Sequence, residues 1–186
     1  MTRAFHNRVR GILDENAAVL SRVCPGDVEK LVRALLKAEK VFIYGQGRTG
    51  HVSRAFATRL MQLGMQAHFV GETTVPRISR RDLCLVNSGT GRTRFVFHVA
   101  AAAKEARAKL ATITAHPEAR IGQMADIIVT VPAPTKGELI HRSSRQPQGS
   151  LFEQAALVMM DAIVMILMER LRISPRRLAQ RHANIE

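Results

Sequence analysis

The sequence predicts an α/β fold: a doubly wound, five-stranded parallel sheet flanked by helices, as in flavodoxin-like or Rossmann-like three-layer sandwiches. Short apolar runs alternate with helical patterns over residues 41–131, which is typical of repeated strand–helix units. Several runs, such as Leu83–Val86, are apolar throughout, as strands buried on both faces are. We expect one domain over residues 1–186, with N-terminal helices in 1–39 and C-terminal helices in 151–186 packed on the sheet.

The predicted elements follow one another along the chain. Residues 4–22 carry apolar side chains at helical spacing, Pro25-Gly26 interrupts the pattern, and Asp27 is placed to cap a second helix through Leu36. The expected strands are Val41–Tyr44, Gln66–Val70, Leu83–Val86, Leu110–Thr114 and Ile127–Val131. The helical stripes between them are Val52, Phe56, Leu60 and Leu63, and then Phe95, Val99 and Ala102–Ala103.

The last third of the chain is predicted to be a long loop followed by two helices. Residues 132–149 have no periodicity and contain three prolines and two glycines, which is typical of a lid or binding segment. Residues 151–171 form a helical pattern that is apolar nearly all round, so we expect it in the core or at a subunit interface. Ser174-Pro175 favours a short last helix that ends near His182.

Charge and composition restrict the function classes. The net charge of +13 is dispersed, and no zinc-finger, RNA-binding or basic-heptad signature occurs, so we expect an arginine-rich surface without a nucleic-acid partner. The positive potential also attracts phosphorylated substrates. Cys24 and Cys84 lack metal-ligand or redox spacing, and the histidines have no acidic cluster, so no metal site is expected. The first residues lack the apolar stretch of a signal peptide, and the apolar run 162–168 is too short for a bilayer, so we expect a cytoplasmic protein without a membrane partner.

Two loops rich in glycine and hydroxyl groups each follow a predicted strand. The first is residues 45–50, Gly-Gln-Gly-Arg-Thr-Gly, and the second is residues 87–93, Asn-Ser-Gly-Thr-Gly-Arg-Thr. A strand that turns into a helix through glycines directs free N–H groups and the positive end of the helix dipole at one point. In doubly wound sheets ligands bind beyond the carboxyl ends of the strands. The pair therefore predicts one anion-binding crevice.

Other interpretations of these residues stay open from spacing alone. The first loop fits the dinucleotide pattern G-x-G-x-x-G, and Glu72 lies near the position of a ribose-binding acid, although that site would leave the second loop unexplained. Tight turns with helix caps would also account for both loops. Ser150–Glu153 has the S-x-x-E spacing of a capping box, which favours a structural role for Glu153, and His182 alone is typical of a surface residue.

An ordered set of segments carries a family resemblance over almost the whole chain. The segments are Gly45–Gly50, Ala55–Ala57, Arg59–Met61, Val70–Thr74 with Pro76, Ser88–Thr93, Gly149–Glu153 and Arg181–Asn184. With these segments the sequence resembles the sugar-isomerase (SIS) domain family. It departs from the family pattern at Asn87, where relatives commonly have an apolar residue, and at Thr90, which replaces a common serine. Residues 138–148 match less well.

The resemblance implies an isomerase that needs no cofactor and converts D-arabino-hex-3-ulose 6-phosphate to D-fructose 6-phosphate through a cis-enediol. It implies that Glu153 is the base and that His182 gives acid assistance, in its own or a neighbouring subunit's site. The substrate-binding residues that it implies are Gly47, Arg48, Ser88, Gly89, Thr90, Gly91, Arg92 and Thr93, with the phosphate on the second loop.

The resemblance also implies a setting for this reaction. The setting is the ribulose monophosphate route of formaldehyde fixation, with a homotetramer that works together with 3-hexulose-6-phosphate synthase. Two alternatives remain: an isomerase for another sugar phosphate, such as arabinose 5-phosphate or sedoheptulose 7-phosphate, and a non-catalytic sugar-phosphate sensor. Sensors of this family place a DNA-binding domain ahead of the sugar domain, whereas only about forty residues precede the first expected strand here.

Overall fold

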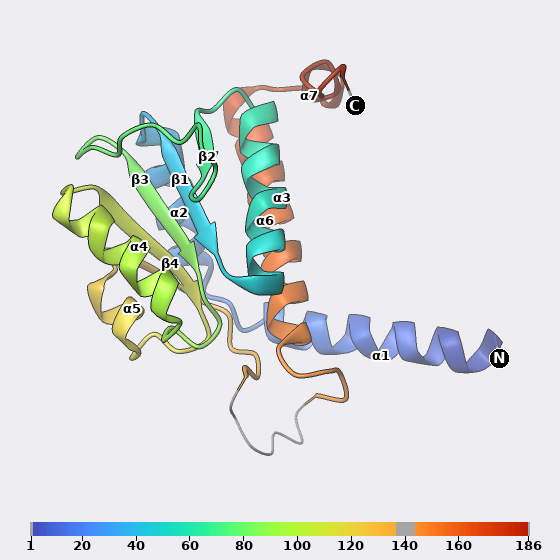
Figure 1. The fold of residues 1–186 in the computed structure, drawn as a ribbon. Helices are drawn as coiled ribbons and strands as arrows, with labels where there is room; N and C mark the ends of the chain where they lie inside the picture. Colours follow the sequence, from blue (N-terminus) through green and yellow to red (C-terminus); the bar gives the residue numbers. More distant parts are fainter. Residues whose placement is uncertain (1, 137–143, 186) are drawn as a thin grey trace.

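A computed structural model describes residues 2–136 and 144–185 and contains one parallel sheet (Figure 1). The strand order is β2-β1-β3-β4-β5, and every neighbouring pair is parallel. The strands are β1 (Val41–Gly45), β2 (Ala67–Phe69), β3 (Leu83–Asn87), β4 (Lys109–Thr114) and β5 (Ile127–Thr130). The predicted doubly wound, five-stranded α/β sheet is confirmed, with a shorter second strand than expected.

The sequence predicts the positions of most helices, but it predicts their first and last residues less well. They are α1 (Thr2–Leu20), α2 (Pro25–Lys37), α3 (Gly47–Gln62), α4 (Arg94–Glu105), α5 (Arg120–Met124), α6 (Ser150–Leu171) and α7 (Pro175–Ala179). The sequence pattern did not predict α5, and α7 ends before His182. Residues 132–136 and 144–149 form neither helix nor strand, as expected, and the rest of the predicted lid lies outside the described residues.

The helix caps test two further predictions. Ser174 caps α7 as predicted, because its side chain accepts a hydrogen bond from the Arg177 N–H. The prediction that Asp27 caps α2 is wrong. The helix begins earlier, at Pro25, with Cys24 as its N-cap residue, so Asp27 lies inside the first turn and binds Lys30 instead. Proline at this first position supplies the helical φ angle without needing an N–H acceptor.

The sheet is covered on both faces, which explains why all five residues of β3 are buried. Leu83 and Leu85 point to the larger core, where α2, α3 and α6 pack. Cys84 and Val86 point the other way, into the smaller core against α4 and α5. Because side chains alternate along a strand, a strand buried on both faces must be apolar at every position. Asn87 is the polar exception at the end of this strand.

Helix α6 is the central helix of the larger core. Within the described residues it is long and apolar enough, by length and composition alone, to cross a membrane. Its composition has another explanation, because half of its 22 residues are buried and it contacts α1, α2 and α3. The prediction of a core helix is therefore confirmed. Helix α1, in contrast, extends away from the sheet and exposes Phe5 and Leu13 (Figure 1).

An ion pair ties α2 to α6 on the surface of this core. Arg170 donates to both carboxylate oxygens of Glu29, with N···O distances of 3.1 and 2.6 Å, and Arg33 donates a third hydrogen bond at 2.7 Å. The hydrogen bonds from Arg170 and then from Arg33 lower the pKa of Glu29 from 4.5 to about 2. A carboxyl group with a lowered folded-state pKa stabilises the fold above its unfolded-state pKa, and this contribution disappears as the pH falls through the folded-state pKa.

We expect Glu29→Gln to lower the melting temperature at neutral pH, and the difference from wild type to shrink as the pH falls from 4.5 toward 2. Thermal unfolding followed by circular dichroism across this range measures the difference. Glu105→Gln is the control, because Glu105 is exposed and has no ion pair in the described parts of the chain. A difference that stays constant down to about pH 2 would contradict the linkage.

Candidate functional site

A cavity of about 190 Å³ lies at the carboxyl ends of β1 and β3, where α3, α4 and α6 begin. Both predicted glycine loops and the start of α6 contribute to it. Its lining residues are Gln46, Gly47, Thr49, Asn87, Ser88, Gly89, Thr90, Thr93, Val96, Thr135, Lys136, Gly149, Phe152 and Glu153. The loops therefore meet in one crevice, at the edge of the sheet where the sequence places a ligand.

Glycines in the first loop bring α3 directly against the end of β1. A Cβ atom at Gly50 would lie 2.6 Å from the carbonyl oxygen of Gly45, which is too close for any side chain. Gly47 begins the helix with a φ of +60°, a conformation that favours glycine. The N-cap residue, Gln46, makes no side-chain cap hydrogen bond, so the first turn of α3 faces the cavity with its N–H groups uncapped. Uncapped N–H groups at a helix start favour an anion.

The second loop forms a tight turn with two unused backbone donors. The Gly91 N–H donates to the Ser88 carbonyl at 3.0 Å and is thereby used within the turn. The N–H groups of Gly89 and Thr90 find no acceptor among the described residues. The Ser88 and Thr93 hydroxyls lie 3.5 Å apart at the start of α4. Two free N–H groups and two hydroxyls around one point are suited to phosphate oxygens.

Glu153 brings a carboxylate from the first turn of α6 into the same cavity. Its side chain is only 5% exposed, and Oε2 lies 3.2 Å from Arg48 Nη1. Within the described part of the chain this oxygen makes no hydrogen bond, so the Arg48 contact is an ion pair without hydrogen-bond geometry. The same Arg48 nitrogen donates to Ser150 Oγ at 2.9 Å, which fixes the guanidinium at the start of α6.

The capping-box interpretation of Ser150–Glu153 is wrong. Helix α6 begins at Ser150 itself, its N-cap residue is Gly149 with a φ of +83°, and no side chain caps it. The Ser150 hydroxyl receives Arg48 rather than capping the helix. The helix begins one residue before the spacing requires, and the Glu153 side chain lines the cavity.

His182, Arg92 and Glu72, which the sequence singled out, do not line the cavity. The His182 ring nitrogens lie 3.3 and 3.4 Å from Gln62 Nε2, at the last residue of α3, whereas the cavity lies at the first turn of this 16-residue helix, about 20 Å away. Arg92 is exposed and does not line the cavity. Glu72 pairs with Arg54 at 3.4 Å outside the cavity, which leaves the dinucleotide interpretation without its acid.

Several lining residues were not predicted. Gln46 and Thr49 lie inside the first loop, whose glycines and Arg48 drew attention away from them. Thr135 and Lys136 belong to the long loop that the sequence marks as a binding segment, although nothing in the pattern selects these two positions. Asn87 carried a usable signal, namely a polar residue at the end of an apolar strand.

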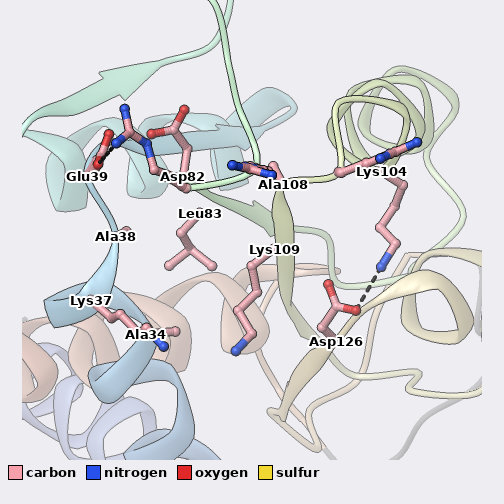
Figure 2. A pocket seen from close by; sticks show the side chains of 13 residues that line it. Ala34, Lys37, Ala38, Glu39, Asp82, Leu83, Lys104, Ala108, Lys109 and Asp126 are labelled. Carbon is pink, nitrogen blue, oxygen red and sulfur yellow. Dashed lines mark hydrogen bonds and ion pairs between the residues drawn. The ribbon is translucent and has the colours of Figure 1, made fainter.

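A larger hollow of about 810 Å³ lies at the opposite edge of the sheet (Figure 2). Its three carboxylates are already engaged: Glu39 with Arg81 at 2.9 Å, Asp126 with Lys104 at 2.7 Å, and Asp82 with the backbone N–H groups of Lys40 and Ser79. It lies at the amino ends of the strands, the edge that doubly wound folds do not use for ligands. The smaller cavity is therefore the candidate site.

Proteins hold metal ions with clusters of ligating side chains. No group of three or more histidine, cysteine, aspartate or glutamate side chains in the described residues is arranged to hold a metal ion. The cavity instead combines donors for an anion with a single buried carboxylate. This arrangement suits the binding of a phosphorylated molecule and the transfer of a proton.

Comparison with known proteins gives a family match. A sequence profile of the SIS domain matches residues 34–158. The chain is 39% identical to a 3-hexulose-6-phosphate isomerase of Mycobacterium gastri, over 97% of this chain and 90% of that protein. It is 35% identical to a 3-hexulose-6-phosphate isomerase of Bacillus subtilis, over 96% of this chain and 97% of that protein.

A solved structure agrees with this match. It is that of a hypothetical protein from Methanococcus jannaschii, for which a molecular function of 3-hexulose-6-phosphate isomerase was inferred. The two chains superpose with a TM-score of 0.84 at 30% sequence identity, over 97% of this chain and 99% of the other. The five-stranded sheet and its helices are thus shared over nearly the whole length of both proteins.

We expect Ser88→Ala to weaken the binding of inorganic phosphate about three- to tenfold, because it removes one hydroxyl donor and leaves the backbone N–H groups in place. Isothermal titration calorimetry measures the dissociation constant. Thr112→Val is the matched control, since this hydroxyl is also buried but lies on β4 outside the cavity. Equal affinities of Ser88→Ala and wild type would remove the Ser88 hydroxyl from the anion site.

Proposed function

Because this chain belongs to the SIS domain family, we propose that it is a sugar-phosphate isomerase that converts D-arabino-hex-3-ulose 6-phosphate to D-fructose 6-phosphate. The observation that carries the proposal is the buried Glu153 carboxylate, which lines the same cavity of about 190 Å³ as the anion-binding donors of the glycine loops. The names of relatives at 35–39% identity support the choice of substrate.

The reaction moves one hydrogen from C2 to C3 and shifts the carbonyl group from C3 to C2. In our proposal the Glu153 carboxylate removes the proton from C2, and the electron pair of that bond forms the C2=C3 double bond of an enediolate. The former carbonyl oxygen takes up a proton, O2 releases one, and Glu153 returns its proton to C3. A single base serves both steps when the enediol is cis, because both carbons then present the same face.

Arg48 supports this chemistry by its position. Its guanidinium lies 3.2 Å from the Glu153 carboxylate and is held by Ser150, so a fixed positive charge adjoins the point where the enediolate forms. Preorganised charges of this kind stabilise a developing oxyanion more than mobile water does. We therefore assign Arg48 to the sugar oxygens, together with Gly47 of the same loop.

The phosphate is assigned to the second loop and the start of α4. The hydroxyls of Ser88, Thr90 and Thr93 and the free N–H groups of Gly89 and Thr90 supply the donors. The positive end of the α4 dipole adds to their attraction for a dianion. Gly91 contributes by shaping the turn, since its φ of +62° and its short distance to Ala119 exclude a side chain.

We propose that His182 acts in the site of a neighbouring subunit of a homotetramer. Within its own chain it lies at the far end of α3 from Glu153. The apolar side chains exposed on α1, such as Phe5 and Leu13, support association of subunits, because α1 extends away from the sheet (Figure 1).

The proposed cellular setting is the cytoplasmic ribulose monophosphate route of formaldehyde fixation. There, 3-hexulose-6-phosphate synthase would supply the substrate. The proposed reaction fits this setting, because joining a one-carbon unit to a pentulose phosphate gives a hexulose phosphate. The proposed isomerisation needs no cofactor, since it moves a proton within one molecule.

A coupled assay tests the proposed function. The 3-hexulose phosphate is generated from formaldehyde and ribulose 5-phosphate by a synthase, and fructose 6-phosphate is detected through glucose 6-phosphate and its dehydrogenase. We expect product formation that depends on this protein. Folded protein that gives no product but binds fructose 6-phosphate would indicate a sensor, and turnover only of arabinose 5-phosphate or sedoheptulose 7-phosphate would indicate another isomerase.

We expect Glu153→Gln to lower kcat at least ~10²-fold, because the amide cannot accept the C2 proton, while binding of fructose 6-phosphate and the melting temperature stay close to wild type. The coupled assay and calorimetry measure these quantities. Glu169→Gln is the control, an exposed glutamate near the other end of the same helix. Near-normal turnover of Glu153→Gln would remove Glu153 from the role of base.

A subunit-mixing experiment tests the position of His182. We expect Glu153→Gln and His182→Gln to be nearly inactive alone, and their co-expressed mixture to recover activity in about one quarter of its sites, the share formed by random pairing of two intact residues in a symmetric oligomer. Turnover per subunit of the separated and mixed proteins measures this. No recovery in a mixed oligomer would place both residues in one chain or exclude His182 from the site.

A further inference from the structure

Asn87 is a buried amide whose hydrogen-bonding groups are unused. The residue is completely buried, and neither its amide nitrogen nor its amide oxygen has a partner in the described residues. It continues the row of Leu83 and Leu85 on the face of β3 that packs into the larger core. Burying an unpaired amide destabilises a folded protein, so an apolar residue at this position would make the fold more stable.

Asn87 adjoins the phosphate loop in the chain, immediately before Ser88, and shares its cavity with Glu153. Its register partner on β1 is Gly45, which has no side chain to pair with the amide or to cover it. Phe152, which also lines the cavity, is apolar and offers no hydrogen bond. No group of the described residues pairs with the amide, which leaves it for a bound molecule to satisfy.

We propose that Asn87 is a specificity-determining residue that binds a hydroxyl group of the sugar chain, on a carbon between the phosphate and the two carbons that exchange the proton. This inference rests on the proposed function. In a 3-ketohexose 6-phosphate the hydroxyls on C4 and C5 occupy that part of the molecule. In this binding mode the second loop, which follows Asn87 in the chain, holds the phosphate, and Glu153 meets C2 and C3 in the same cavity.

The chemistry of the amide favours a hydroxyl over a phosphate oxygen. Asn87 presents an NH₂ donor and a carbonyl acceptor, and both are unpaired. A hydroxyl group both donates and accepts, so hydroxyls satisfy both ends of the amide. A phosphate dianion only accepts, so it would leave the amide carbonyl buried without a donor. Asn87 therefore distinguishes a polyhydroxylated phosphate from phosphate alone.

The test compares the affinities for two ligands in variants that cannot convert the substrate. Asn87→Val and Asn87→Ala are each made in the Glu153→Gln protein, and calorimetry measures the affinities for fructose 6-phosphate and inorganic phosphate. We expect both variants to bind fructose 6-phosphate about five- to tenfold more weakly, the effect of losing hydrogen bonds to one hydroxyl. The affinity for inorganic phosphate should change less than about twofold, since the phosphate donors remain.

Two further readouts distinguish specificity from a structural role. The melting temperature of Asn87→Val without ligand should equal or exceed that of the parent, because an unpaired amide is removed from the core. With Glu153 intact, Asn87→Val should raise KM for the hexulose phosphate more than it lowers kcat. Thr112→Val is the matched control, since its hydroxyl is also buried and unpaired but lies on β4 outside the cavity, so its affinities should equal those of the parent.

The outcomes separate this inference from the proposed function. Unchanged affinity of the Asn87 variants for fructose 6-phosphate, or equal losses for both ligands, would overturn the specificity role alone. A loss with Asn87→Val but not with Asn87→Ala would also overturn it, because obstruction by the larger side chain would then be the cause. Failure of the Glu153→Gln parent to bind fructose 6-phosphate would overturn the proposed function and this inference together.

Discussion

The parallel pairing of β1 with β3 positions everything else in the site. Its register sets Gly45 beside Asn87, so the two glycine loops leave the sheet next to each other and at the same edge. Each loop leads into a helix whose first turn carries no side-chain cap, so two helix starts converge on one cavity. Parallel strands require a crossover between them, and the crossover through α3 and β2 keeps both loops at this edge.

The first turn of the core helix α6 is part of the site. Most of this helix is apolar and buried, and that packing fixes the direction of its first residues. A carboxylate buried in such a place needs a cation nearby, because an isolated charge in a dry interior is costly. Arg48 supplies that charge from the first glycine loop without saturating the carboxylate with hydrogen bonds. The Glu153 carboxylate is thus buried beside a largely exposed guanidinium, and one of its oxygens has no hydrogen bond among the described residues.

The sequence predicted the sheet better than the helix ends. Strands buried on both faces must be apolar, so runs such as Leu83–Val86 are visible from composition, whereas α5 is only five residues long and shows no period. The cap predictions for Asp27 and Ser150 were wrong because a cap depends on where the first helical residue falls, and here proline and a left-handed glycine moved that point. The distance of His182 from the cavity depends on tertiary packing, which no local pattern contains.

The unpaired polar atoms of the core are concentrated where a ligand can satisfy them. Among the described residues, six buried side-chain atoms have no hydrogen-bond partner, and three of them belong to Asn87 and Glu153 in one cavity. Each destabilises the unliganded fold, and a ligand that pairs with them removes that cost only in the bound state. The free energy lost in the empty site is then recovered on binding. The same polar groups that weaken the fold therefore select the molecule that fills the cavity.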